Sequence, residues 1–397
     1  MKRILLVLFC AIAYQSVAQV GLGTNDPKAG LHVVDRNVVF SAAGDVTVSE
    51  RAPLTDANRR LMWYPEQAAF RAGLVNSYGV TYWDTPNIGN YSFSTGENTR
   101  ASGEYSIAMN LATTASGDGA VAMGNNAAAI GNHSVAFSGT AGNTGSVVIG
   151  SGAQAESDHA MALGPSSIAR GGESVTFGPS KTYGDFSMAI GLQNNAWAPY
   201  SIAIGKNANS GRLGSMVLSD GSAGFSSDST VATAANQLAI RGANGIRLFT
   251  NSELSSGVEL AAAGGGWNVI SDRRAKENFQ TISATEAESI LQKVATIPIA
   301  RWNYKSQPTT QLHIGPMAQD FHAAFQLDGL ANDTTINTVD IDGVNMVAIQ
   351  ALERRTTALR SGTDNLAGEL AAMDQRLAVL EAWVAGLMAG STGKPTK

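Results

Sequence analysis

The 397-residue sequence is short of cysteine, of charge and of aromatic side chains. Its single cysteine, Cys10, excludes a disulfide scaffold and a cysteine-based zinc site. Charged residues make up 15% of the chain and the formal net charge is -5, which argues against a nucleic-acid-binding protein. Aromatic residues make up 7%, whereas glycine occurs 43 times, so we expect many turns and small packed side chains rather than one bulky core.

The start of the chain, Met1 to Ala18, has the composition of a secretory signal peptide. A short cationic start precedes an apolar stretch at residues 4–14, and the small residues Ser16 and Ala18 stand where such a peptide is cleaved. The apolar stretch is too short for a transmembrane anchor, which needs about 20 residues. We therefore expect an exported mature chain that begins at Gln19 and has no membrane span.

A six-residue pattern recurs ten times in the middle of the sequence. It has the form x-Ser-apolar-small-apolar-Gly, and successive copies start at nearly equal intervals. Large and small residues alternate along the pattern, and this period of two indicates a β-strand. An interval of about 14 residues suffices for two short strands and two turns. Coils stacked about 4.8 Å apart predict a parallel β-solenoid on the order of 48 Å long. The copies begin at Tyr91, Tyr105, Gly119, His133, Gly145, His159, Glu173, Phe186, Tyr200 and Gly214.

The two faces of the repeated strand differ in side-chain size. We expect large apolar residues such as Ile107 and Met109 to lie on the buried face, and glycines to close the copies at tight corners. Intervening residues such as Ala108 then form a smooth apolar face that further copies of the chain would cover. The repeats resemble the heads of trimeric autotransporter adhesins, which are left-handed β-rolls, and this resemblance implies a homotrimer.

The repeats carry no regular ladder of metal ligands. Asp118, Asp158 and Asp185 are too sporadic for calcium-binding repeats. His133 and His159 share one position of the pattern, and we interpret them as polar turn residues rather than as a shared metal site. We accordingly predict no metal and no cofactor.

Two segments flank the repeats, which we place at residues 91–224. We expect residues 19–90 to include a cap, because the end of a solenoid needs to be covered, and residues 225–270 to form a β-rich connector. The cap would use three aromatic residues that could otherwise serve as a binding platform. These residues are Trp63, Tyr64 and Phe70.

The C-terminal part contains three motifs in a fixed order. A Ser-Asp-Arg-Arg-Ala-Lys run starts at Ser271, a His-Ile-Gly-Pro-Met-Ala-Gln run at His313, and a Val-Asp-Ile-Asp-Gly run at Val339. This succession resembles the intramolecular chaperone of endosialidases and phage tail spikes, the peptidase S74 family. The resemblance covers residues 271–360 and implies a small α+β domain.

Two helices are expected in this part. Ser283 and Glu286 form a capping box that opens a helix ending before Pro298. Residues 349–387 hold a heptad pattern with ten apolar residues in twelve a and d positions, which predicts a coiled coil. The a positions are Ile349, Thr356, Thr363, Leu370, Leu377 and Val384, and the d positions are Leu352, Leu359, Leu366, Met373, Leu380 and Leu387.

The resemblance to the S74 family implies self-cleavage between Ile270 and Ser271. Ser271 would be the nucleophile, Lys276 its proton acceptor, and His313 an accessory residue, although a purely structural histidine is an equal alternative. A spacing of five does not place Ser271 and Lys276 on one helical face, so their contact requires a turn or a neighbouring subunit. Because a lysine accepts a proton only when neutral, a form that desolvation favours, we expect trimer assembly to activate it.

These observations predict a secreted or surface-exposed, mainly β, homotrimeric fibre with a self-cleaving C-terminal chaperone. A surface glycan or a protein receptor is its expected partner, and we expect no activity on external substrates. One alternative is a glycan-degrading enzyme, but residues 19–270 leave no room for a large catalytic domain and hold no evident carboxylate pair. The signal peptide argues against another alternative, a phage tail fibre.

Overall fold

The computed structural model describes residues 19–47, 56–327 and 334–390. The chain divides into two compact units, Met1–Ile246 and Arg247–Lys397. The predicted signal peptide, with Cys10, lies outside the described residues. Within the described ranges no helix combines the length and the apolar character needed to cross a bilayer.

Two strand pairs precede the repeats in the first unit. β1 and β2 pair in parallel, whereas β3 and β4 form an antiparallel hairpin. β4 also pairs in parallel with the first repeat strand, β5, so the hairpin continues a sheet of the solenoid. The elements are β1 (Val20–Leu22), β2 (Leu31–Val33), β3 (Asn58–Tyr64), β4 (Ala69–Val75) and the 3-10 turns η1 (Pro65–Gln67) and η2 (Thr85–Asn87).

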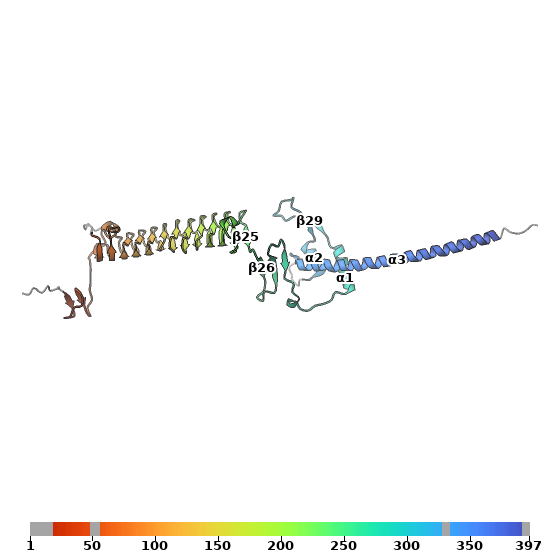
Figure 1. Cartoon of the computed structure of the whole chain (residues 1–397), viewed down its shortest axis with the longest axis horizontal. Coiled ribbons are helices and arrows are strands. Elements are labelled where there is room, and N and C mark those ends of the chain that lie inside the picture. The colour runs from red at the N-terminus through yellow and green to blue at the C-terminus, as the bar shows by residue number, and fades with distance from the viewer. Residues whose placement is uncertain (1–18, 48–55, 328–333, 391–397) are drawn as a thin grey trace, which may run out of the picture. The chain divides into compact units, whose positions relative to one another are not determined.

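The repeats form the predicted parallel β-solenoid, seen in Figure 1 as a stack of short strands. Each six-residue pattern supplies one strand of a 13-stranded sheet, ordered β25-β23-β21-β19-β17-β15-β13-β11-β9-β7-β5-β4-β3. Equivalent residues of neighbouring copies pair, for example Ala189 with Ala203. The strands are β5 (Phe93–Glu97), β7 (Ile107–Leu111), β9 (Val121–Asn125), β11 (Val135–Phe137), β13 (Val147–Ile149), β15 (Met161–Leu163), β17 (Val175–Phe177), β19 (Met188–Leu192), β21 (Ile202–Lys206), β23 (Met216–Ser219) and β25 (Leu238–Arg241).

Very short strands between the copies form the second wall of the solenoid. They build a ten-stranded sheet ordered β24-β22-β20-β18-β16-β14-β12-β10-β8-β6. The pairs in this sheet are also parallel, for example β18 with β20. The strands are β6 (Arg100–Ala101), β8 (Thr114–Ala115), β10 (Ala128–Ala129), β12 (Thr140–Ala141), β14 (Gln154–Ala155), β16 (Ile168–Ala169), β18 (Lys181–Thr182), β20 (Asn195–Ala196), β22 (Ala208–Ser210) and β24 (Thr230–Val231).

A residue with positive φ opens each of the ten copies. The first residue of every copy has φ between 54° and 65°, including non-glycine residues such as Tyr105 and His159. The glycines that close the copies have positive φ, for example 118° at Gly191, but Gly191 lies within β19 rather than at the expected corner. A Cβ atom at Gly191 would collide with the carbonyl oxygen of Gly205 in the next coil, so the close stacking of coils also requires glycine there.

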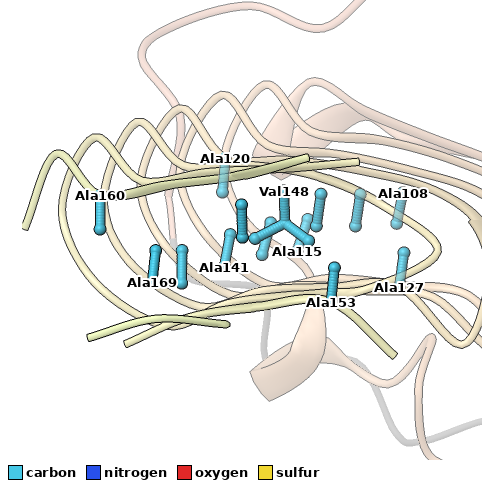
Figure 2. Packing of buried hydrophobic residues seen from close by; sticks show 14 of the residues in the cluster. Ala108, Ala115, Ala120, Ala127, Ala141, Val148, Ala153, Ala160 and Ala169 are labelled. Carbon is cyan, nitrogen blue, oxygen red and sulfur yellow. The ribbon is translucent and has the colours of Figure 1, made fainter. Parts of the chain in front are cut away.

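The structure reverses the expected assignment of the two strand faces. Intervening residues such as Ala108 and Ala162 are fully buried inside the solenoid, and Figure 2 shows the alanine side chains of its two walls pointing toward one another. Larger flanking residues such as Ile107 and Met109 face outward and are half-buried. A coil of about 14 residues encloses too little space for large side chains at native packing density. The surface left for other copies is therefore the row of large apolar residues.

The β3–β4 hairpin packs against the first coil through the pairing of β4 with β5. Tyr64 is buried, and its hydroxyl donates a hydrogen bond to the carbonyl oxygen of Trp83 at 2.8 Å. Phe70 stacks on Phe93 with ring centroids 5.4 Å apart. Trp63 stands opposite Phe70 in the hairpin and is partly exposed.

Arg71 closes the interior of the solenoid beside this hairpin. Its fully buried guanidinium donates hydrogen bonds of 2.8 to 3.1 Å to the carbonyl oxygens of Phe70, Ser92 and Ala101 and to the Ser92 hydroxyl. All these acceptors are uncharged, and burial lowers the pKa of Arg71 to about 10. The alternation pattern gives no sign that this arginine is buried.

The second unit begins within β26 and combines two small sheets with three helices. The first sheet has the order β26-β27-β28, and the second is the antiparallel β29–β30 hairpin. The elements are β26 (Gly245–Phe249), β27 (Gly257–Ala261), β28 (Trp267–Val269), the 3-10 helix η4 (Arg273–Ala275), α1 (Ala284–Thr296), β29 (Ala300–Trp302), β30 (His313–Gly315), α2 (Ala318–Phe325) and α3 (Thr338–Gly390).

Both helices predicted in this part are present. The Ser283 hydroxyl accepts a hydrogen bond from the Glu286 amide at 3.2 Å and so caps α1. α1 packs along the first turns of α3, where Val344, Ala348 and Ala351 are buried. α3 has 53 residues, and its heptad residues from Leu352 onward lie almost entirely exposed. Their association as a coiled coil stays a prediction.

Candidate self-cleavage site

The strand β28 fixes the residue that precedes Ser271. It pairs antiparallel with β27, with Val269 opposite Val258. The Ile270 amide continues this pairing, since it donates a hydrogen bond to the carbonyl oxygen of Gly257 at 3.1 Å. The carbonyl side of the Ile270–Ser271 bond is thus anchored to a sheet, and the chain leaves the sheet at Ser271.

A single 3-10 turn brings Lys276 back to Ser271. The Ala275 amide donates to the carbonyl oxygen of Asp272 at 3.1 Å, and the Lys276 amide donates to that of Arg273 at 3.2 Å. The Lys276 Nζ then donates a hydrogen bond of 2.5 Å to the Ser271 Oγ. The sequence left open whether this contact comes from a turn or from another subunit, and the structure forms it by a turn within one chain.

Asp272 caps this turn. Its carboxylate accepts a hydrogen bond from the Arg274 amide at 2.9 Å and pairs with the Arg274 guanidinium at 2.7 Å. Hydrogen bonds from the Arg274 side chain and then from its amide lower the pKa of Asp272. The carboxylate of Asp272 therefore stays charged at neutral pH and continues to accept these hydrogen bonds. Sequence reasoning missed this role of Asp272, although a short polar residue just before a turn is a capping signal.

The site is open to solvent in the single chain. Residues 271–280 are all exposed, and Ile270 is half-buried. The Arg273 guanidinium covers the ring of Phe279 at 4.7 Å from its centroid. A nucleophile and a candidate proton acceptor are in contact, but nothing in the described part of the second unit shields them from water.

Comparison with known families matches both parts of the described chain. Residues 271–330 match the family described as chaperone of endosialidase, and we call them the chaperone segment. Residues 88–109, 115–137, 141–175 and 183–208 match the YadA head domain repeat. These regions of the chain are similar to YadA head repeats and to the endosialidase chaperone. Both resemblances seen in the sequence are thereby confirmed, whereas a comparison with curated proteins finds no match.

His313 of the chaperone segment lies in the β29–β30 hairpin. It stands opposite Trp302, and the two rings stack with centroids 4.8 Å apart. Its Nε2 shares a hydrogen bond of 3.0 Å with the Gln307 side chain, and its ring also meets the edge of Tyr304. Among the described residues these contacts hold His313 within its own hairpin rather than against Ser271 or Lys276.

The aspartates and histidines singled out in the head repeats contact the backbone of the preceding coil. The Asp118 and Asp158 carboxylates accept hydrogen bonds of 3.0 and 3.1 Å from backbone amides one coil earlier. His133 and His159 lie at left-handed corners, each beside the glycine of the preceding coil. In the part of the chain that the structure describes, no three or more histidine, cysteine or acidic residues gather for a metal.

Proposed function

We propose that this chain is an exported homotrimeric surface fibre whose C-terminal part assists assembly and is then released by cleavage between Ile270 and Ser271. The head repeats and the chaperone segment support a trimeric, adhesin-like or tail-fibre-like protein. The hydrogen bond between Lys276 Nζ and Ser271 Oγ carries the cleavage part of the proposal. Without this contact Ser271 would have no base beside it.

The proposed reaction has two steps. The Ser271 oxygen attacks the carbonyl carbon of Ile270 and gives its proton to a neutral Lys276. The bond between this carbon and the Ser271 nitrogen breaks, the nitrogen takes the proton, and an ester remains. Water then hydrolyses the ester with Lys276 again as proton acceptor, which leaves a carboxylate at Ile270 and the free hydroxyl of Ser271.

Trimer assembly would bury Lys276 and so favour the neutral form that can accept a proton. Two exposed apolar surfaces of the chain are suited to contact between copies: the outward row of large residues on the 13-stranded sheet and the heptad stripe of α3. Burial disfavours the charged form of a lysine. Cleavage would then follow assembly, because only neighbouring copies could cover a site that lies open in one chain.

Mass analysis of the purified protein tests this proposal. We expect the wild type to yield a fragment that runs from Ser271 to Lys397, and a fibre that begins at Gln19 and ends at Ile270. Ser271→Ala and Lys276→Ala should each remain intact, with at least a hundredfold slower cleavage. Lys305→Ala is the matched control, since this lysine is also exposed and should not affect cleavage. Processing of Ser271→Ala at the wild-type rate would overturn the assignment.

A further inference from the structure

Two columns of stacked aromatic side chains lie at one corner of the head repeats. Trp197 follows Tyr183 at the equivalent position of the next coil, and their rings stack with centroids 3.9 Å apart and planes 8° apart. Tyr200 follows Phe186 in the same way, at 5.2 Å and 3°. Trp197 and Tyr200 are three residues apart in sequence, at the turn that joins β20 to β21.

Both columns stop at glycine in the following coil. The strand register places Gly211 after Trp197 and Gly214 after Tyr200. A glycine offers no side chain to cover the ring before it. Trp197 is 48% exposed and Tyr200 60% exposed, although one face of each ring is stacked. Each ring therefore lacks an aromatic partner in the following coil and is largely exposed.

Polar groups adjoin these two rings. Arg212 lies between the two glycines and is exposed, and within the described residues its guanidinium has no hydrogen-bond or ion-pair partner. The Asn236 side chain, one coil further on, lies against Gly214. The Asn236 Oδ1 would collide with a Cβ atom at Gly214, so this side chain reaches back toward the coil that carries Tyr200.

We propose that Trp197 and Tyr200 form a stacking site for one pyranose ring of a glycan. A pyranose presents a flat face of C–H groups, which fits the electron-rich face of an aromatic ring. Its hydroxyl groups need hydrogen-bonding partners, which the donors of Arg212 and the amide of Asn236 provide. This inference rests on the proposed function of a surface fibre and names its partner.

The two rings are separate from the surfaces assigned to trimer contact. They belong to the turn between the two sheets, whereas the trimer surface is the outward row of the 13-stranded sheet. Stacking alone does not mark the site, since Tyr91 and Tyr105 also stack, 5.1 Å apart, near the other end of the solenoid. There the second column carries Ser102 in place of an aromatic residue, so only one ring is present.

Alanine variants of the two aromatic residues test the site in the mature trimer. The probes are the methyl glycosides of glucose, galactose, N-acetylglucosamine and glucuronic acid, measured by saturation-transfer NMR and tryptophan fluorescence. Trp197→Ala and Tyr200→Ala should each weaken binding about tenfold. Tyr105→Ala is the matched control, because Tyr105 has the same 60% exposure and the same left-handed backbone, and it should bind as the wild type does.

Gly211→Tyr tests the site without removing any residue. A Cβ atom at Gly211 meets only the Asn209 side-chain oxygen, at 3.8 Å, so a tyrosine there has room to extend the stack over Trp197. Binding should be lost while thermal stability stays the same or rises. Retained binding in Gly211→Tyr, or no binding of any probe by an intact wild-type trimer, would overturn the site and leave the proposed function standing.

The oligomeric state separates the two proposals. Light scattering should show a trimer for the wild type and for all four variants. A monomeric wild type would refute the proposed function itself. Dissociation of the Trp197→Ala trimer would instead assign the rings to contact between copies and would overturn the glycan site.

Discussion

Asp272 determines the geometry of the candidate site through one carboxylate. It accepts the Arg274 amide and pairs with the Arg274 guanidinium, and these bonds close the turn that places Lys276 against Ser271. Its pKa in the folded chain lies below the ordinary value of 3.8, chiefly through the Arg274 side chain. The stabilisation of the turn by the carboxylate is therefore complete above pH 3.8 and is lost as the pH falls through the lowered pKa.

Replacing Asp272 should slow self-cleavage. We expect Asp272→Ala to reduce the rate about tenfold because the turn loses its cap, and Asp272→Asn to restore part of the rate because an amide oxygen still accepts the Arg274 amide. A time course of fragment release at neutral pH measures both rates. Glu277→Ala, a neighbouring exposed acid, is the control. Equal rates for all three variants would show that the turn forms without the carboxylate.

Single residues also mark the limit of what the sequence could predict. Ser271, Lys276 and His313 were found through the motifs of the chaperone segment, but their distances were not, because the 3-10 turn depends on a cap rather than on a helical period. Arg71 was missed altogether. Its burial follows from the end of the solenoid interior, which exists only once the coils are stacked.

At the scale of the elements, the period of the repeat predicted the strands, and the width of the coil decided which face is inside. Alternation showed that Ala162 and its neighbours Met161 and Leu163 point to opposite sides. It did not say which side is enclosed, and the expectation that large residues are buried was wrong because two walls so close together admit only small side chains.

Enlarging an interior alanine should destabilise the solenoid. Ala162 is fully buried beside Val148 of the preceding coil, so Ala162→Leu should lower the free energy of unfolding by about 1–3 kcal/mol through overpacking. Thermal unfolding of the uncleaved Ser271→Ala protein measures this change. Leu163→Met, on the outward side of the same strand, should have little effect. A larger loss for Leu163→Met than for Ala162→Leu would contradict the observed orientation of the strand.

At the scale of the whole molecule, the long helix α3 is expected to control whether cleavage occurs. Its exposed heptad leucines offer other copies of the chain a surface to pack against, and the candidate site lies open in a single copy. The two family matches support a trimer, whereas the mixed a and d residues of the heptad do not set the number of strands.

Charge placed in the heptad stripe should therefore abolish processing. We expect the double variant Leu366→Asp and Leu370→Asp to be monomeric and to remain uncleaved at residue 270, because buried charge opposes association. Light scattering and mass analysis measure the two properties on one sample. Ala372→Asp, on the outer side of the same helix, should trimerise and be processed normally. Full processing of a monomeric variant would show that Lys276 needs no neighbouring copy.

The end of β28 at Val269 has a further consequence for the life of the fibre. Under the proposed function, cleavage directly after Ile270 would leave this strand paired with β27 in the retained part and would remove the segment proposed to assist assembly. A fibre melted after processing would then lack the means to refold, so its persistence would depend on its unfolding rate rather than on equilibrium. Heating and cooling should be reversible before the cut and irreversible after it.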